Sequence, residues 1–232
     1  MPRKPRLDLV GVAQHVVQRG HNREVCFARD EDFAAYAHWL KEASVRANVS
    51  IHAWVFMTNH VHLLVTPHKN FAVSKMMQYL GGRYVPYFNY TYQRSGTLWE
   101  GRFKSSLIDN YDYLLKCYRY IELNPVRAYM VDHPDEYRWS SYSINALGSE
   151  SELCTPHEVY LHLVKNKEER CRYYRELFRS ELDIKVINKF RYATKKGLLV
   201  GRDDFKNQIE HHLQRKIGDG MQGRPKKNKN VL

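Results

Sequence analysis

Two histidines separated by one residue stand in an otherwise apolar stretch, "HVHLLV", at residues 60–65. In a β-strand, residues two apart point to the same face, about 6.5–7 Å apart along the chain. His60 and His62 would therefore be presented together, with Val61 turned the other way. Imidazole nitrogens bind divalent metal ions, so the pair could hold one ion. A bare pair is more simply explained as two hydrogen-bonded structural histidines, and it does not complete a metal site.

A third group for such a site comes from "YRYIELNP", at residues 118–125. Tyr120 and Asn124 are four residues apart, so on a helix they share a face, with about 5–6 Å between their Cβ atoms. Asn124 could supply an amide oxygen to a metal ion, and Tyr120 a phenolic oxygen beside it. The structural alternatives are a core tyrosine and a helix C-terminal cap before Pro125. The combination with the histidine pair favours a metal site next to a tyrosine.

The elements that must position these residues follow from the spacing of apolar residues and from turn signals. The predicted strands cover residues 9–20, 50–57, 60–67 and 97–109, and the predicted helices cover 29–48, 71–92 and 110–125. An Asp cap begins the first helix, Gly81, Gly82 and Pro86 kink the second, and Pro125 ends the third near Asn124. The turn between the two middle strands is Thr58–Asn59.

The order of these elements is βαββαβ followed by one further helix, which carries Tyr120. This is the ferredoxin-like, RRM-like pattern of an α+β protein with an antiparallel sheet, in which the first and third strands are central. The third strand carries the two histidines, which explains its apolar neighbours. The predicted domain covers residues 1–148, a helical C-terminal appendage follows at 149–218, and a basic flexible tail covers 219–232.

Composition narrows the choice of partner and compartment. The 232 residues carry 37 Lys and Arg against 25 Asp and Glu, a net charge of +12, which favours a polyanion such as nucleic acid. The four cysteines form no CxxC pair, so neither a zinc knuckle nor a disulfide framework is predicted, and a reducing cytoplasm fits. The N-terminus has no apolar region typical of a secretion signal. Residues 51–68 lack formal charge, but their histidines, Asn59 and Pro67 argue against a membrane span.

The motifs resemble those of a known family. "HVHLLV" is similar to the His-hydrophobic-His motif of the HUH nucleases, whereas "YIELNPVRAYMV", "QRGHNR" and "LWEGRFKSSLI" resemble the REP-associated tyrosine transposases, a single-tyrosine HUH family. The similarity extends from about Val10 to Tyr142. The resemblance implies that Tyr120 is the nucleophile, and that His60, His62 and Asn124 hold a divalent metal ion. Tyr111, Tyr113 and Tyr118 lie nearby, so this assignment of the nucleophile depends on the Tyr-to-Asn spacing.

The resemblance also implies a reaction. Tyr120 would attack a phosphodiester of single-stranded DNA, leaving a 5′-phosphotyrosine and a free 3′-hydroxyl, and another strand's 3′-hydroxyl could reverse the step without ATP. Ligand preference alone would suit zinc or manganese. The resemblance implies Mg²⁺ or Mn²⁺, which we expect because water and phosphate oxygens would complete the coordination. The implied substrate is a palindromic repeat folded into a hairpin, with a short guide sequence beside its foot.

Cations and stacking surfaces for DNA are present around these motifs. The predicted DNA-binding residues are Arg19, His21, Asn22, Arg23, Trp99, Arg102, Lys104, Arg127, Arg224, Lys226 and Lys227. For each one, a solvated basic face or a core tryptophan explains the residue about equally well. The "GRPKK" segment of the tail resembles a minor-groove arginine hook, although a generic phosphate-binding tail is the simpler interpretation.

Three alternatives remain beside the transposase hypothesis. The chain could be a non-catalytic, sequence-specific DNA-hairpin binding protein or regulator. A histidine-triad nucleotide hydrolase would need another histidine in place of Leu64, and an RNA-binding sheet would need strand aromatics that are not evident. We expect a monomer in the cytoplasm, associated with the nucleoid and not with a membrane.

Overall fold

The structure is a computed structural model, and it describes residues 6–109 and 112–218. A single sheet has the strand order β2-β3-β1-β4-β5. Its strands are β1 (Gln14–Arg19), β2 (Val49–Met57), β3 (His60–Pro67), β4 (Lys104–Ile108) and β5 (Leu199–Val200). The first four pair in antiparallel fashion, whereas β5 is parallel to β4. The predicted α+β, ferredoxin-like fold with β1 and β3 at the centre is therefore confirmed.

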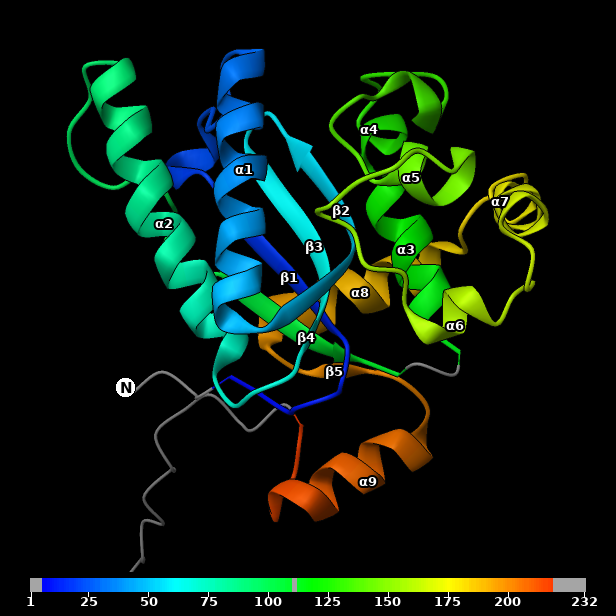
Figure 1. Cartoon of the computed structure of the whole chain (residues 1–232). Coiled ribbons are helices and arrows are strands. Elements are labelled where there is room, and N and C mark those ends of the chain that lie inside the picture. Colours follow the sequence, from blue (N-terminus) through cyan, green and yellow to red (C-terminus); the bar gives the residue numbers. More distant parts are fainter. Residues whose placement is uncertain (1–5, 110–111, 219–232) are drawn as a thin grey trace, which may run out of the picture.

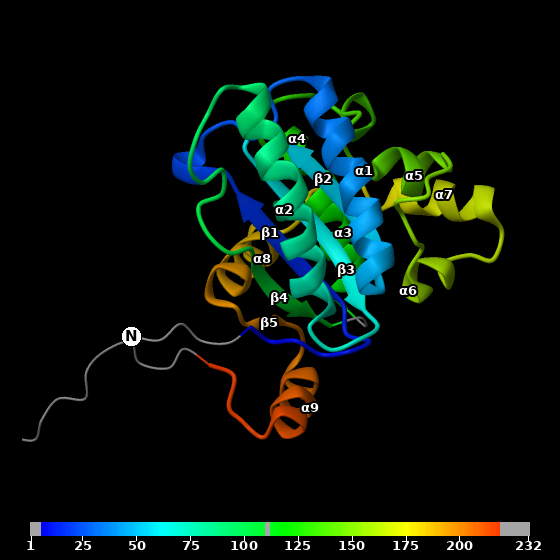
Figure 2. The ribbon, with the colours of Figure 1, turned by 60° about the vertical axis from the view of Figure 1, so that its left-hand side comes forward.

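Helices cover both faces of this sheet. They are α1 (Asp30–Ala47), α2 (Ala72–Thr91), α3 (Leu114–Glu122), α4 (Asn124–Arg127), α5 (Tyr142–Leu147), α6 (Glu158–Leu161), α7 (Lys167–Glu176), α8 (Ile184–Lys196) and α9 (Asp203–Leu213). Helices α1 and α2 lie side by side on one face, and α3 and α8 lie on the other (Figures 1 and 2). Among the described residues, none of the helices has the length and hydropathy of a membrane span.

Alternation along β3 decides what each face carries. Val61, Leu63 and Val65 belong to the core beneath α1 and α2. The intervening Leu64 belongs to the second core, beneath α3 and α8, and His60 and His62 share its side of the strand because the side-chain period is two. Burying the apolar residues on one face thus fixes both imidazoles on the other.

Several element boundaries differ from those predicted. Strand β1 begins at Gln14 because Gly11 turns the chain with φ 76°, and β4 begins at Lys104, after Gly101 at φ 145°. Helix α1 has Arg29 at its N-cap, not an aspartate, although the Asp32 carboxylate accepts the backbone N–H of Arg29. Helix α2 runs on past Pro86, and Asn124 begins α4 directly after α3.

The segment after residue 149 is largely helical, as expected, and it also contributes to the sheet. Its strand β5 extends the sheet beyond β4, and helix α8 lies against β4 and β1. Gly197, at φ 68°, ends α8 in the left-handed conformation and lets the chain turn into β5. The predicted tail at 219–232 lies outside the described residues.

A buried carboxylate ties α3 to the C-terminal helices. Glu122 is fully buried and accepts hydrogen bonds from Ser141 Oγ (2.6 Å), Asn145 Nδ2 (2.8 Å) and Tyr174 Oη (2.7 Å). Burial raises the pKa of Glu122 to about 7, and the three hydrogen bonds only partly oppose the shift. This network joins the tyrosine-bearing helix to α5 and α7.

The raised pKa of Glu122 predicts a pH-dependent stability. Between the unfolded pKa of 4.5 and about 7, the folded protein binds more protons at this group, so the free energy of unfolding falls as pH rises. Between pH 4.5 and 8, Glu122 should lower the free energy of unfolding by about 2–3 kcal/mol, and we expect this decrease to be absent in Glu122→Gln. Chemical denaturation across that range measures it. The exposed control Glu150→Gln should parallel the wild type, and equal slopes in all three proteins would contradict the assignment.

Candidate active site

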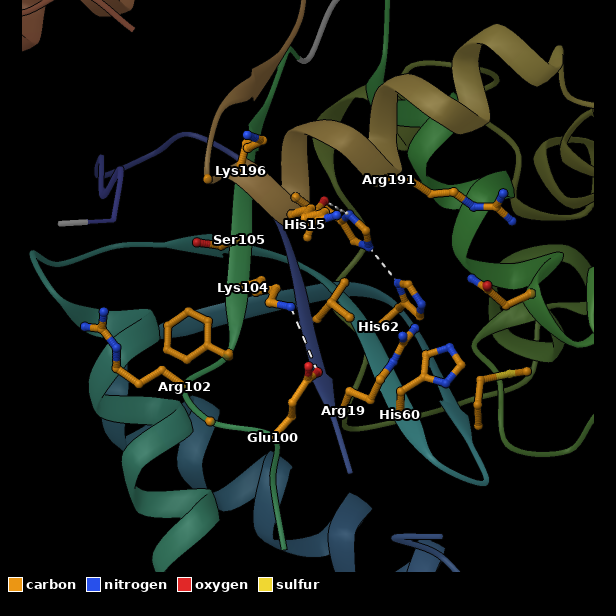
Figure 3. A pocket seen from close by; sticks show the side chains of 18 of the residues that line it. His15, Arg19, His60, His62, Glu100, Arg102, Lys104, Ser105, Arg191 and Lys196 are labelled. Atoms are coloured by element: carbon orange, nitrogen blue, oxygen red, sulfur yellow. Dashed lines mark hydrogen bonds and ion pairs between the residues drawn. The ribbon is translucent and has the colours of Figure 1, made fainter. Parts of the chain in front are cut away.

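A cleft of about 980 Å³ opens on the sheet face that carries the histidines. Its floor comes from β1, β3 and β4, one wall from α3 and α4, and the other from α8. Figure 3 shows His15, His60 and His62 along this floor, with Arg191 of α8 above them. The cleft thus joins the two sequence motifs to a helix that neither motif includes.

The two histidines occupy the β3 side of the floor. His60 pairs with Arg19 across the sheet, and the ring centres of His60 and His62 are 5.0 Å apart. Each ring uses Nδ1 in a hydrogen bond: His60 to Asn59 Oδ1 (2.6 Å) and His62 to His15 Nε2 (2.8 Å). The Nε2 atoms are therefore the nitrogens available to a ligand.

Both imidazoles are held neutral. Burial, followed by the charge of Arg19, lowers the pKa of His60 to about 4. Burial also lowers the pKa of His62 well below its usual value, and His60, His15 and nearby arginines add to the shift. A metal ligand must be neutral imidazole, so this environment favours metal binding over proton binding.

Tyr120 projects from α3 onto the same floor. Its ring centre lies 5.7 Å from that of His62 and 5.5 Å from that of His15, edge-on in both cases. Phe190 of α8 stacks on it at 5.1 Å, and the Arg127 guanidinium lies 4.7 Å from its centre. The phenol is 4% exposed, and burial raises its pKa, opposed by the charges of Arg127 and Arg191. The hydroxyl is therefore protonated at neutral pH.

Asn124 has a structural role in this arrangement. Its Nδ2 donates to the backbone oxygens of Tyr120 (2.9 Å) and Ile121 (3.1 Å), as a side chain does at a helix end. The helix-capping alternative is therefore realised, and it fixes the amide with its nitrogen turned toward α3. The Oδ1 atom remains as the potential metal ligand.

These side chains fit a divalent ion by the chemistry of their donors. Within the described ranges, no group of three or more His, Cys, Asp or Glu could hold a metal. The candidate set instead combines two neutral imidazoles with an amide oxygen. Such a set carries no charge and lies beside Arg19 and Arg127, so a bound ion would need phosphate oxygens from a substrate to balance the site.

The structure gathers some of the predicted DNA-binding residues and separates others. Arg19, Arg23, Arg102, Lys104 and Arg127 line the cleft. His21 and Asn22 lie on the exposed 3₁₀ turn His21–Arg23, which follows β1. Arg224, Lys226 and Lys227 lie outside the described residues.

Trp99 is a core residue and not a stacking platform. It is 7% exposed, and its ring centre lies 6.1 Å from that of Tyr84 and 6.3 Å from that of Tyr36. Both neighbours belong to the core beneath α1 and α2, on the face away from the cleft. The chain pairs with β1 at the isolated bridge between Trp99 and Gly20, which turns the indole inward.

Several cleft residues escaped the sequence analysis. His15 could have been found, because it stands two residues before Val17 and four before Arg19 on one face of β1. Arg191, Thr194, Lys195 and Lys196 of α8 also line the cleft. Only tertiary packing brings that helix to the sheet, so no spacing in the sequence indicates it.

The chain is similar to a known protein family and to solved structures. The family described as "Transposase IS200 like" matches residues 9–124, which include both histidines, Tyr120 and Asn124. The structure of a REP-associated tyrosine transposase bound to a REP hairpin is similar at TM-score 0.55 and 18% identity, covering 68% of this chain and 93% of that one. A Deinococcus radiodurans R1 protein assigned as a transposase matches at TM-score 0.37 and 16% identity, covering 53% and 95%.

The comparisons differ in what they establish. No curated protein matches the chain. The structural similarity to the REP-associated enzyme, at TM-score 0.55, establishes a shared fold. The family match extends over half of the chain and spans the strand and helix that form the cleft. The chain belongs to the IS200-like transposase family.

Proposed function

We propose that this protein is a metal-dependent endonuclease and strand transferase for single-stranded DNA, acting beside repeat hairpins through a 5′-phosphotyrosine. One observation carries the proposal: the Tyr120 ring meets His62 edge-on at 5.7 Å inside a cleft lined by cations. A nucleophile, a pair of neutral imidazoles and phosphate-binding groups thereby share one site. The hairpin as substrate follows from the resemblance to the REP-associated enzymes, one of which is described bound to a REP hairpin.

The proposed step exchanges one phosphoester for another. The Tyr120 oxygen forms a bond to phosphorus, the bond from phosphorus to the 3′-oxygen breaks, and that oxygen leaves as a 3′-hydroxyl after taking up a proton. The phenolic proton is lost to solvent. A divalent ion, Mg²⁺ or Mn²⁺, held by His60, His62 and Asn124, would act as a Lewis acid on the phosphate oxygens. Because the number of ester bonds is unchanged, a second 3′-hydroxyl can reverse the step and join strands.

Arg127 is suited to hold the reacting phosphate. Its Nη2 donates to the backbone oxygen of Tyr120, whereas its Nη1 is buried without a hydrogen-bond partner. Burial lowers the pKa of Arg127 to about 10, which still leaves the side chain charged at neutral pH. A buried cationic donor without an acceptor costs free energy, and a phosphate oxygen beside Tyr120 would supply that acceptor.

One chain supplies all of these residues. Tyr120 and both histidines meet within the same subunit, so we propose that the protein works as a monomer, in the cytoplasm and associated with the nucleoid. The alternative is a DNA-hairpin binding protein without chemistry, which the same cationic cleft would also serve. Size-exclusion chromatography with light scattering tests the first point, and the adduct assay separates the two functions.

The decisive experiment is covalent capture of DNA. A hairpin oligonucleotide with a single-stranded flank, labelled on the side that would carry the 5′-phosphate, is incubated with the full chain and Mg²⁺ or Mn²⁺. A labelled band that survives denaturing electrophoresis, and that disappears with a chelator, supports the proposal. Tight binding by gel shift without a covalent band under either metal would overturn the enzyme and leave the binding protein.

The position of Arg191 on α8 leads to a prediction about the salt dependence of DNA affinity. Arg191 lines the cleft beside Tyr120, so it is placed to contact a phosphate of the bound strand. We expect Arg191→Gln to reduce the slope of log affinity against log salt by about 0.7, because one fewer counterion is released from a single strand. Fluorescence anisotropy at several salt concentrations measures the slope. The exposed control Arg172→Gln, on α7, should leave it unchanged.

A further inference from the structure

A chain of buried hydrogen bonds runs from His62 to helix α8. His62 Nδ1 lies 2.8 Å from His15 Nε2, and His15 Nδ1 lies 2.9 Å from Thr194 Oγ1. Thr194 Oγ1 in turn lies 3.1 Å from Ser106 Oγ of β4. His15 is 1% exposed, His62 5%, Thr194 5% and Ser106 1%, so the polar groups of the chain depend on one another for partners. Figure 3 shows the bonds that His15 makes to either side.

Only two arrangements of protons allow both hydrogen bonds of His15 to form, because each neutral imidazole has one N–H and one bare nitrogen. In the first, His62 Nδ1–H donates to His15 Nε2, His15 Nδ1–H donates to Thr194, and His62 Nε2 is bare. In the second, every donor is reversed, and His62 carries its proton on Nε2. Only the first leaves the cleft-facing nitrogen of His62 with a lone pair.

The charges around His62 favour the first arrangement. Arg19 and Arg127 both act on the His62 ring, and a guanidinium can only donate hydrogen bonds. A bare Nε2 is attracted to these cations, whereas an N–H at that position would direct its positive end at them. At the other end of this series of hydrogen bonds, the Thr194 hydroxyl can accept from His15 and donate its own hydrogen bond to Ser106 Oγ.

We propose that His15 and Thr194 are positioning residues that hold the His62 proton on Nδ1 and keep Nε2 bare for a metal ion. The inference rests on the proposed function only in naming His62 as a metal ligand. Metal-binding histidines commonly donate their second nitrogen to an oriented acceptor, and here that acceptor is another imidazole. Thr194 lies well beyond residues 9–124, so a C-terminal helix outside the family match completes the site.

We expect removal of the Thr194 hydroxyl to reverse the direction of the hydrogen bond between His15 and His62. In Thr194→Val, an N–H at His15 Nδ1 would lose its acceptor, so His15 would move its proton to Nε2 and donate to His62 Nδ1. His62 would then carry its proton on Nε2, and metal binding would require that proton to return to Nδ1, which weakens the affinity. Thr194→Ser keeps the hydroxyl and should keep the wild-type arrangement.

Imidazole ¹H–¹⁵N correlation spectra of the metal-free protein test the inference, with His62 assigned from the His62→Gln spectrum. We expect Nδ1–H in the wild type and in Thr194→Ser, and Nε2–H or a mixture in Thr194→Val. The matched control is Thr66→Val, which breaks another buried hydrogen bond from threonine to histidine, 2.8 Å to His52. Nε2–H on His62 in the wild type, or an unchanged His62 in Thr194→Val, would overturn the proposal.

A second measurement concerns the metal. In a Tyr120→Phe background with a single-stranded oligonucleotide, calorimetry should show Mn²⁺ affinity reduced about 10-fold by Thr194→Val and by less than about 3-fold by Thr194→Ser. Equal affinity with threonine and valine would overturn the role in metal binding. The result of this test is independent of the adduct assay. If the predicted tautomers are observed but no covalent adduct forms, this inference is supported and the proposed DNA-cleaving activity is rejected.

Discussion

Replacing Tyr120 by phenylalanine is expected to abolish covalent capture of DNA, with a loss of at least about 1,000-fold, while the fold is retained. The change removes only the oxygen that would attack phosphorus. The ring contacts with Phe190 at 5.1 Å and with His15 at 5.5 Å do not involve that oxygen and would survive. Denaturing electrophoresis of the labelled adduct measures the loss, and gel shift on the same hairpin should show affinity within about 3-fold of the wild type.

Tyr118 provides the matched control on the same helix. Its hydroxyl is buried in the core beneath α3 without a side-chain hydrogen-bond partner, so its removal should cost little stability. Tyr118→Phe should therefore form the adduct at the wild-type rate. An adduct that persists in Tyr120→Phe and disappears in Tyr118→Phe would move the nucleophile two residues along the helix and reject the assignment from the Tyr-to-Asn spacing.

The sheet could be predicted because local patterns encode it, whereas the meeting of the two motifs was implied by the resemblance to the transposase family. Alternation in β3 puts Val61 and Leu63 against α1 and α2 and leaves His60 and His62 on the other face. The spacing from Tyr120 to Asn124 brings the Asn124 amide, at the start of α4, back to the end of α3, where its Nδ2 bonds the backbone oxygen of Tyr120. A period of two in a strand and of about four in a helix requires no knowledge of distant packing.

The remaining parts of the site depend on contacts between distant segments. Helix α8 supplies Phe190, Arg191 and Thr194, but its sequence carries an apolar face and basic residues like those of many surface helices. Trp99 shows the opposite case, since its basic neighbours suggest a DNA-binding surface while the bridge to Gly20 turns it into the core. In both cases, side-chain direction is decided by tertiary packing, which single-sequence patterns do not record.

His60→Ala is expected to reduce DNA cleavage about 1,000-fold while hairpin affinity stays within about 2-fold. Loss of one of two imidazoles would weaken the hold on the metal ion, and a Lewis acid at a phosphate is worth several kcal/mol, with about 1.4 kcal/mol for each factor of ten. Binding should survive because the cations that line the cleft, among them Arg19 and Arg127, are untouched. Single-turnover cleavage and fluorescence anisotropy on the same oligonucleotide give the two values.

His60 is a cleaner test than His62 for a structural reason. The His60 ring is only partly buried, and its one hydrogen bond is to the adjacent Asn59, so alanine should cost about 1 kcal/mol of stability. His62 is 5% exposed, and its removal would also strand the buried His15. The control is His68→Ala, an exposed histidine just beyond the end of β3 that bonds Ser50 and should leave cleavage unchanged. Cleavage by His60→Ala at the wild-type rate, in a folded protein, would show that the histidine pair is structural and that any metal is held elsewhere.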